Sequence, residues 1–311
     1  MRAVTYDEYG PIDRLQIREV PDPKPGRSEI LVSVRFAALN PKDAVFRRGR
    51  FARVSGRKFP KFCGLDFAGS VVASRSPHFS IGQRVFGALN EWRFLRGTLA
   101  ERVCVRDHEA ALLSSGVAEE AAAAIALTGL TALQALRDIG RVQAGARVLI
   151  HGASGGVGTA AIQIARALGT DVVTTSSARN LELCTRLGAS DARDYADQPF
   201  AALPRMDVVF DAFGNLSRAD IATILVGGGV YISTIPTLAR LVRDRLTRWR
   251  FIQERLVVVR PRRIDLELLS GWLQDGTVSP VIDSRYPLSQ VHDAFRVLES
   301  KRARGKIVIE V

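Results

Sequence analysis

Hydrophobic and polar positions follow different patterns in the two parts of the chain. Over the first hundred residues, short apolar segments are bounded by Gly, Pro and charged residues, which is typical of β-strands. We expect strands at 2–6, 15–20, 30–37, 67–73 and 98–105. The N-terminal part is therefore predicted to be a β-rich module.

From about residue 117 an Ala-rich helical run leads into apolar strand patterns that alternate with helical ones. We expect strands at 147–151, 172–176, 207–211 and 230–234, with helices at 155–168, 180–187 and 217–226 between them. The pattern continues with a strand at 256–259, helices at 264–274 and 289–299, and a last strand at 306–311. Strands that alternate with helices predict a parallel, doubly wound sheet, so the fold class is α/β.

A glycine-rich loop joins the first strand of the alternating part to its helix. Ala153, Gly155 and Gly158 occupy the three small positions of the dinucleotide-binding fingerprint. Small residues let the backbone turn sharply and approach a pyrophosphate, which then lies on exposed N–H groups at a helix N-terminus. Predicted cofactor contacts in this loop are Ser154, Gly155, Gly156, Val157 and Gly158.

The end of the second alternating strand distinguishes between two cofactors. NAD sites normally carry Asp or Glu about 20 residues past the glycines, where the carboxylate binds the ribose 2′-OH. This chain has Ser176, Ser177 and Arg179 there instead. Hydroxyls and a guanidinium suit a 2′-phosphate, which favours NADP(H); the alternative is that Arg179 is a solvated residue that begins the next helix.

Charge is concentrated in two segments. The 311 residues include 44 Lys and Arg against 32 Asp and Glu, a formal net charge of +12, and the length suggests two domains. Residues 35–61 hold nine basic residues and one acid, residues 240–263 hold nine and two, and the rest is slightly acidic. No RNA-binding motif with interleaved aromatics accompanies them, so a nucleic-acid partner is not expected.

The cysteines indicate a reducing compartment. Cys63, Cys104 and Cys184 are far apart and form neither a CxxC motif nor a Cys/His ligand spacing. The first residues lack the apolar core of a signal peptide, and the longest apolar stretch, 121–135, is interrupted by polar residues. We expect a cytoplasmic protein without a spanning helix.

Several ordered motifs resemble the medium-chain dehydrogenase/reductase superfamily, and within it the zinc-independent quinone reductase group. The motifs are the glycine loop together with 38–43, 63–69, 82–87, 127–132 and 305–311. The resemblance implies a GroES-like catalytic domain from residues 1–117 and 262–311, an inserted Rossmann domain from 118–261, and a cleft between the two. Homodimers are usual in this family.

The resemblance also implies a site without metal. Zinc alcohol dehydrogenases place Cys where this chain has Asn40, His-Glu where it has Leu65 and Asp66, and a further Cys near Leu127. Leu cannot ligate zinc, and Asn is a poor ligand. An acceptor that is already electrophilic, such as a quinone or an α,β-unsaturated carbonyl, takes hydride without a Lewis acid.

Roles for the catalytic residues follow from the resemblance. Asn40 would offer an amide donor to developing oxyanion charge, and Thr128 would contact the nicotinamide. The alternatives are a turn residue before Pro41 and an ordinary helix hydroxyl. Asp43 is expected to orient the Asn40 loop rather than to act as an acid. Val45 and Phe51 stand where some family members have tyrosines, which leaves solvent as the proton source.

The remaining site assignments concern the substrate and the rest of the cofactor. Phe46, Phe51 and Phe62 are candidates for an apolar substrate pocket, with ordinary core packing as the alternative. Tyr195 resembles the residue at the adenosine end. Phe213, Ile232 and Ser233 follow sheet strands at the edge where ligands bind. Lys306 is either a cofactor contact or a surface lysine.

These features together predict an NADPH-dependent, zinc-independent oxidoreductase that transfers hydride to a quinone or an α,β-unsaturated carbonyl. The alternatives are an enoyl-thioester reductase and a non-catalytic NADPH-binding regulator or RNA-binding protein. The resemblance places both basic segments at one entrance, where they would steer an anionic ligand or contact an anionic membrane. The basic amphipathic stretch 238–251 fits a membrane contact, and a solvated helix is the alternative.

Overall fold

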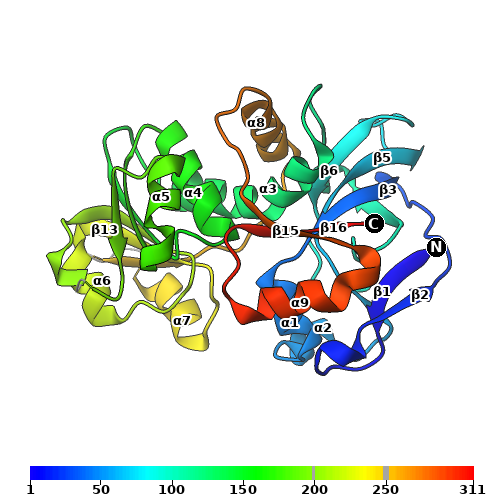
Figure 1. Cartoon of the computed structure of the whole chain (residues 1–311), viewed down its shortest axis with the longest axis horizontal. Helices are drawn as coiled ribbons and strands as arrows, with labels where there is room; N and C mark the ends of the chain where they lie inside the picture. The colour runs from blue at the N-terminus through cyan, green and yellow to red at the C-terminus, as the bar shows by residue number, and fades with distance from the viewer. Residues whose placement is uncertain (198–199, 248–251) are drawn as a thin grey trace. The chain divides into compact units, whose positions relative to one another are not determined.

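The computed structural model describes residues 1–197, 200–247 and 252–311. They form two compact units (Figure 1). The first unit comprises Met1–Leu127, Arg260–Gly276 and Pro280–Val311, and the second comprises Thr128–Val259 with Thr277–Ser279. The second unit is thus inserted into the first, as the resemblance implies, and the chain touches it a second time only at Thr277–Ser279.

The first unit is built on a seven-stranded sheet and a smaller three-stranded one. The strand order of the large sheet is β15-β16-β3-β5-β6-β8, with β7 paired to β3, and that of the small sheet is β2-β1-β4. The strands are β1 (Arg2–Tyr6), β2 (Gln16–Glu19), β3 (Glu29–Ala38), β4 (Lys61–Phe62), β5 (Asp66–Ser74), β6 (Arg84–Ala88), β7 (Arg102–Arg106), β8 (Ala110–Leu112), β15 (Ile282–Pro287) and β16 (Lys306–Glu310). Because alternate residues of β3 point to opposite faces, Ile30, Val32 and Val34 enter the core.

The helices of the first unit include one that begins directly after β3. They are α1 (Pro41–Arg47), α2 (Ala52–Ser55), the first part of α3 (Glu119–Leu133), α8 (Arg263–Gln274) and α9 (Val291–Ser300). Pro41 fits the first position of α1 because that position needs no N–H. The C-terminal strand β16 pairs antiparallel with β3, which brings residue 306 of the tail beside the start of α1.

The second unit is a Rossmann fold. Its six parallel strands lie in the order β11-β10-β9-β12-β13-β14, the classic doubly wound order. The strands are β9 (Arg147–His151), β10 (Asp171–Ser176), β11 (Asp191–Asp194), β12 (Met206–Asp211), β13 (Leu225–Ser233) and β14 (Gln253–Leu256). The helices are α4 (Gly156–Ala167), α5 (Leu181–Leu187), α6 (Arg218–Ile224) and α7 (Leu238–Leu246). The predicted parallel sheet is confirmed.

Several features differ from the sequence-based expectations. The boundary between the units falls at Leu127 and Thr128, inside α3, and not at residue 118, because the first turns of α3 pack into the first unit. In the predicted strand 98–105, regular pairing begins only at Arg102, after an isolated bridge between Ala3 and Ala100. Helices α1 and α2 and strands β4, β6, β8, β11 and β15 were not predicted.

Among the described residues, one helical segment is long and apolar enough to cross a membrane. The run Glu119–Ile139 passes by length and composition, and most of it is buried inside the protein. Such burial is that of a core helix, which meets the same criterion. The segment for which a membrane contact was considered, 238–251, forms α7 over its first part, and residues 248–251 lie outside the described residues.

Candidate functional site

The glycine loop of the second unit leaves no room for side chains at two positions. Gly152 has a φ of +77°, a conformation that favours glycine. A Cβ at Gly158 would lie 2.4 Å from the carbonyl oxygen of Gly152, so helix α4 can approach the loop only without a side chain there. A Cβ at Gly155 would find its nearest neighbour at 3.6 Å, so that position is open. The loop matches the predicted pyrophosphate cradle, with Gly155 as the N-cap of α4.

A buried asparagine, absent from the sequence-based assignments, organises the polar groups at the end of β10. Asn180 donates its two amide hydrogens to the hydroxyl oxygens of Ser154, at 2.9 Å, and of Ser177, at 3.0 Å. Because each hydroxyl is occupied as an acceptor, its own hydrogen remains available to donate to a ligand. The sequence signal was an Asn directly before a helix, which alone predicts only a cap.

The other residues that were predicted to contact the adenosine part of the cofactor lie at the end of β10 or on the segments that follow β10 and β11. Arg179 is exposed, and Ser176 is buried at the end of β10. The backbone N–H of Tyr195 donates to the carbonyl of Ser176, and its side chain is 54% exposed. The acid of this edge, Asp194, accepts from the backbone N–H groups of Ala178 and Ala196. The segments that carry these hydroxyls, the guanidinium and the exposed ring therefore lie at the carboxyl ends of β10 and β11.

The ends of β12 and β13 are held by a second buried group, Asp211. Its carboxylate accepts from the backbone N–H groups of Phe213, Gly214 and Leu216 and from the Tyr231 hydroxyl. Phe213 is half exposed and lies against Gly152 of the glycine loop. Ile232 and Ser233 are fully buried, and the Ser233 hydroxyl accepts from Ile235 N–H, so the side chains assigned to cofactor contact belong to the core.

His151 and Thr128 are both buried in this unit. The ring nitrogens of His151 lie 2.7 Å from the Thr175 hydroxyl and 2.7 Å from the Asn215 side-chain oxygen, so its role is structural. Thr128 lies on α3 as the first residue of the second unit. The second unit as a whole fits a dinucleotide, because it combines a glycine-rich loop at a helix N-terminus with a hydroxyl-lined end of β10.

In the first unit, three buried polar side chains from distant parts of the chain form one cluster. The Lys306 ammonium donates to Asn40 Oδ1 at 2.7 Å, to Asp66 Oδ2 at 2.8 Å and to the Leu39 carbonyl at 2.9 Å. Asn40 Nδ2 donates to the same Asp66 oxygen at 2.8 Å. Lys306 is only 4% exposed and Asp66 is fully buried, so the surface-lysine alternative is wrong. All three hydrogens of the ammonium have acceptors within this unit.

The cluster changes what Asn40 can do. Its second amide hydrogen is directed at the Ala38 carbonyl, at 3.3 Å, so both donors are already used within the protein. The sequence-based role, an amide donor to substrate oxyanion, has no free hydrogen in this arrangement. Asp66 is the residue that sequence reasoning missed here, although an acid within an apolar segment such as 65–69 was a signal of a buried partner.

Asp43 holds the backbone on both sides of this cluster. Its carboxylate accepts from the N–H groups of Asn40, at 2.8 Å, and Gly64, at 3.0 Å. Burial raises the pKa of Asp43 to about 6, although these two hydrogen bonds favour the charged form. The expectation that Asp43 orients the Asn40 loop is confirmed.

The three phenylalanines assigned to a substrate pocket have different surroundings. Phe46 is buried, stacks on Phe51 with ring centroids 5.1 Å apart, and also packs against Phe94 and Trp92. Phe62 lies apart from them in β4, where its N–H donates to the Phe94 carbonyl. Phe46 is thus a core residue, and Phe51 and Trp92, which retain some exposure, form the accessible part of this aromatic cluster.

The residues of the buried cluster do not fit a zinc ion. The side-chain oxygens of Asn40 and Asp66 already face an ammonium, and Leu65 has no ligating atom. Over residues 1–197, 200–247 and 252–311, no group of three or more His, Cys, Asp and Glu residues is arranged to hold a metal. We therefore derive no chemistry from a metal at this position.

Comparison with known proteins connects both units to one family. Residues 26–126 match the profile of the alcohol dehydrogenase GroES-like domain, and residues 187–309 match a profile described as zinc-binding dehydrogenase. A 2-methylene-furan-3-one reductase from Solanum lycopersicum is 35% identical over 99% of this chain and 79% of its own length. The chain belongs to the medium-chain dehydrogenase/reductase superfamily. Within it, the chain falls in the zinc-independent quinone oxidoreductase-like group.

Two further members of this superfamily are close in sequence or structure. The NADPH-dependent alkenal/one oxidoreductase of Arabidopsis thaliana chloroplasts is 33% identical over 99% of this chain and 79% of its own length. The structure of the quinone oxidoreductase from Coxiella burnetii superposes with a TM-score of 0.92, at 29% identity, over 100% of this chain and 99% of the other. The GroES-like and Rossmann assignment is thereby confirmed, and the chain is an oxidoreductase that depends on a pyridine nucleotide.

A hollow elsewhere in the Rossmann unit is separate from this site. It has a volume of about 410 Å³ and is lined mainly by residues 140–143 and 226–230. These residues lie at the amino ends of the strands, whereas the glycine loop lies at the carboxyl ends. Ligands of doubly wound sheets bind at the carboxyl ends, so the hollow is not the nucleotide site.

Proposed function

We propose that the protein is an NADPH-dependent, zinc-independent reductase of quinones or α,β-unsaturated carbonyls. The observation that carries this proposal is the combination of a complete dinucleotide cradle with a buried Asn40–Asp66–Lys306 cluster in which an ammonium faces the oxygens. Without a Lewis acid, the substrate must already be electrophilic at the atom that accepts hydride. The names of the relatives, an alkenal/one oxidoreductase and a quinone oxidoreductase, describe such substrates.

NADPH is proposed over NADH because of the end of β10. The Ser154 and Ser177 hydroxyls retain their hydrogens for a phosphate, and Arg179 is exposed beside them. The acid in the neighbouring strand, Asp194, is engaged with backbone N–H groups and does not replace the usual ribose-binding carboxylate. When bound, NADPH supplies the hydride; the glycine loop and these side chains hold it.

The experiment is a turnover panel on the purified full chain. NADPH oxidation is measured with quinones, enones and enoyl-CoA thioesters, and repeated with NADH. We expect turnover with a quinone or an enone and a kcat/KM at least about tenfold higher with NADPH, equivalent to about 1.4 kcal/mol. A preference for the enoyl-CoA thioester would indicate an enoyl-thioester reductase. Tight NADPH binding without any turnover would indicate a regulator and contradict the proposal.

We also propose a homodimer in the cytoplasm. The family resemblance supports the dimer, and three free cysteines, two of them buried, are compatible with a reducing compartment. Light scattering coupled to size exclusion, at protein concentrations near those used for the kinetics, measures the mass directly. A mass equal to the monomer's 34.0 kDa at all concentrations would contradict the dimer.

A further inference from the structure

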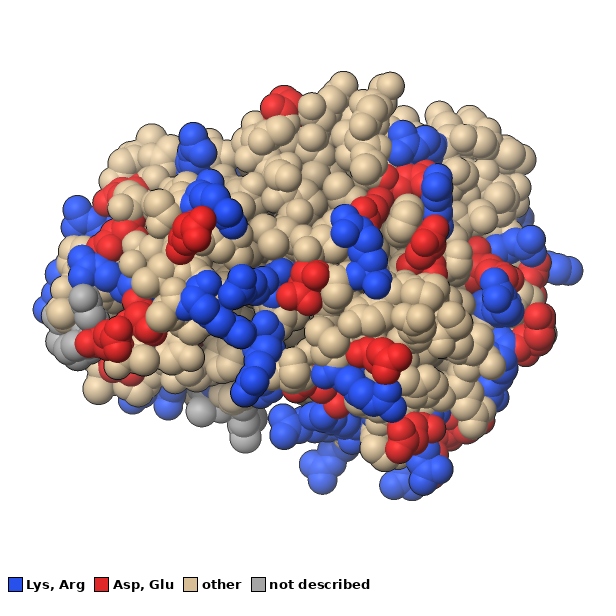
Figure 2. Space-filling model, viewed as in Figure 1, with Lys and Arg blue, Asp and Glu red and all other residues tan. Residues whose placement is uncertain are grey.

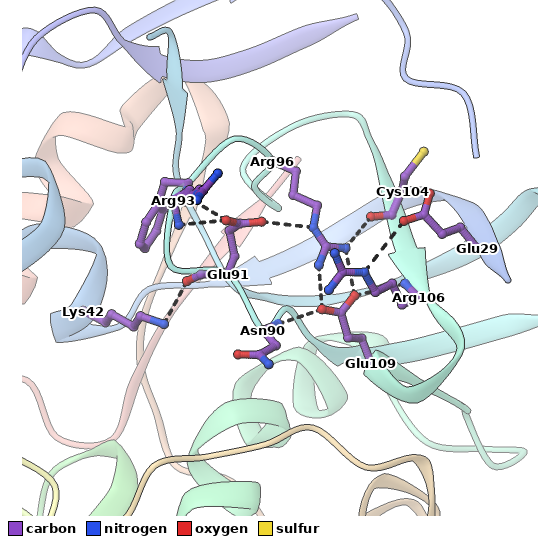
Figure 3. Close-up of polar contacts among 10 residues, drawn as sticks. Glu29, Lys42, Asn90, Glu91, Arg93, Arg96, Cys104, Arg106 and Glu109 are labelled. Carbon is purple, nitrogen blue, oxygen red and sulfur yellow. Dashed lines mark hydrogen bonds and ion pairs between the residues drawn. The ribbon is translucent and has the colours of Figure 1, made fainter. Parts of the chain in front are cut away.

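Lys42 lies on the first turn of α1, two residues beyond Asn40, and faces a cluster of aromatic rings. Its ammonium is 4.1 Å from the centroid of the Trp92 ring and within 6 Å of the Phe46 and Phe94 centroids. It donates one hydrogen bond, of 2.9 Å, to the Glu91 carbonyl (Figure 3). The side chain is half-buried, so it is both partly desolvated and accessible.

The hydrogen-bonding capacity of Lys42 is only partly used. An ammonium has three hydrogens, and the Glu91 carbonyl takes one. In the part of the chain that the structure describes, we find no second acceptor within hydrogen-bonding distance and no carboxylate within ion-pairing distance of it. Lys306, in contrast, has all three hydrogens engaged, and both amide hydrogens of Asn40 are engaged as well. Near the buried Asn40–Asp66–Lys306 cluster, Lys42 therefore has N–H groups that can still donate to a ligand.

The electrostatic surroundings favour release of a proton. Burial lowers the pKa of Lys42 to about 8, while the charges of Asp43 and Glu91 act in the opposite direction. Asp43 is directed at backbone N–H groups, and the Glu91 carboxylate accepts from the backbone of Arg93 and Phe94 and from the Arg96 guanidinium (Figure 3). Neither carboxylate forms an ion pair with the Lys42 ammonium. Their charges therefore raise the pKa of Lys42 less than burial lowers it.

The loop that faces Lys42 is held in place by a second ion pair. The Arg96 guanidinium donates to both oxygens of Glu109, at 2.6 and 2.8 Å, and to the Cys104 carbonyl, as Figure 3 shows. Glu109 is fully buried and also accepts from the N–H of Asn90, the residue before Glu91. The carbonyl and the ring that position Lys42 are thus fixed by contacts outside the aromatic cluster.

We infer that Lys42 is the proton donor of the reductase, a catalytic residue that contacts the reduced substrate and gives a proton to its oxygen or its α-carbon. This inference rests on the proposed function. Hydride addition to the β-carbon of an enone brings two electrons and one hydrogen and leaves an enolate. The Lys42 ammonium gives one proton to that enolate, its N–H bond breaks as the new bond forms, and the amine regains a proton from water. With a quinone, the same proton goes to the oxygen of the hydroquinone monoanion.

The test compares Lys42→Met and Lys42→Arg with a matched control, Lys58→Met, which removes an exposed lysine from the same basic segment. The substrate is the quinone or enone that the wild-type protein turns over best. We expect kcat to fall by about 100-fold or more in both Lys42 variants, within the usual range for a general acid, and to stay at the wild-type value in Lys58→Met. A guanidinium keeps the positive charge and the contact with Trp92 but does not release a proton near neutral pH.

The pH profile supplies a readout that a structural role would not move. Because the donor must be protonated, kcat/KM of the wild type should fall as the pH rises through about 8, and this limb should be absent from both Lys42 variants. NADPH affinity and the unfolding midpoint of each variant show whether it is folded. If Lys42→Met does not fold, Lys42→Arg and the wild-type profile carry the test.

Two results would overturn the inference without affecting the proposed function. One is full activity in Lys42→Arg, which would mean that only the charge or the stacking is needed. The other is a wild-type profile that is flat between pH 7 and pH 9, the range around the proposed pKa of about 8. A wild-type protein that reduces no quinone or enone would instead overturn the proposed function.

Discussion

Lys306 and Asp66 form an ion pair from which water is excluded, so each depends on the other. Lys306→Met leaves the Asp66 carboxylate buried with only two neutral donors, Asn40 Nδ2 and Leu127 N–H. Breaking one partner of a buried pair typically costs about 3–5 kcal/mol. We expect this loss in the free energy of unfolding in urea, with no comparable loss in Lys58→Met.

A second variant tests the reason for that loss. In Lys306→Met with Asp66→Asn, the buried negative charge is removed together with its partner. Part of the lost stability should return, because a neutral amide costs less to bury than a carboxylate. A double variant as unstable as the sum of the two single variants would show that packing, and not charge, holds the cluster.

Asp43 makes stability depend on pH. Its pKa is raised to about 6 in the folded protein, so the folded state binds the proton more tightly than the unfolded state. Protonation of Asp43 therefore contributes most to the free energy of unfolding below about pH 4. This contribution falls by about 3 kcal/mol as the pH rises through about 6. Thermal unfolding across this range, compared between wild type and Asp43→Asn, isolates the slope because Asn does not titrate. Parallel curves would contradict the assignment.

At the scale of an element, the loop between β9 and α4 predicts different outcomes for two glycines. Gly158→Ala should lower the unfolding midpoint, because a Cβ would lie 2.4 Å from the Gly152 carbonyl oxygen and the helix would have to shift. Gly155→Ala should leave the midpoint nearly unchanged, since its φ is −80° and its nearest neighbour is at 3.6 Å. It should nevertheless weaken NADPH binding by about tenfold or more, because the methyl group occupies the pyrophosphate approach.

Calorimetric unfolding and NADPH titration of the two variants separate these effects. Equal loss of stability in both would mean that the loop is packed more tightly at Gly155 than the structure shows. Unchanged NADPH affinity in a folded Gly155→Ala would place the pyrophosphate elsewhere.

The end of β10 predicts a change of cofactor. Ser177→Asp replaces a hydroxyl that can donate to a phosphate by a carboxylate that repels it and can accept from a ribose 2′-OH. We expect kcat/KM to fall by about tenfold or more with NADPH and to rise with NADH. Steady-state kinetics with both nucleotides measure this, and Ala144→Asp, at an exposed position in the turn before β9, is the control for an added charge. An unchanged ratio would remove the end of β10 from the cofactor site.

At the scale of the whole molecule, the basic segments carry less free charge than their counts indicate. Arg47 is fully buried and pairs with Glu299, and Lys61 is buried against two backbone carbonyls. In the second segment, Arg243 pairs with Glu254 and Arg240 donates to the Tyr231 hydroxyl. Figure 2 shows basic and acidic side chains interspersed over much of the visible face.

Exposed arginines on and beside α2 are one group that can attract an anion. They are Arg50, Arg53 and Arg57. If they steer NADPH, kcat/KM for NADPH should fall as salt rises from low ionic strength to 0.15 M, where the screening length is about 8 Å. Arg53→Glu should weaken this salt dependence. A kcat/KM that does not change with salt, together with no retention by anionic liposomes, would leave these residues with a solvation role only.

The elements of the Rossmann unit were largely predictable, whereas the buried Asn40–Asp66–Lys306 cluster was not. Strand 147–151 and the helix after the glycines follow from local hydrophobic period and glycine spacing, which neighbouring residues determine. Strands such as β15 are half exposed and have no continuous apolar pattern, so their existence depends on pairing with β16. The boundary between the two units, which falls inside α3, could not be predicted. A continuous helix gives no local signal of the unit against which each turn packs.

The sequence by itself determined the order of the elements, the dinucleotide cradle and the absence of an acid after β10, because each is a property of residues close together in the chain. Only the tertiary structure decided that Lys306 meets Asn40 and Asp66, which lie 266 and 240 positions away. It also decided which arginines are buried and which lysine keeps hydrogens to donate. Those outcomes depend on the antiparallel pairing of β16 with β3 and on side-chain packing, which no local pattern records.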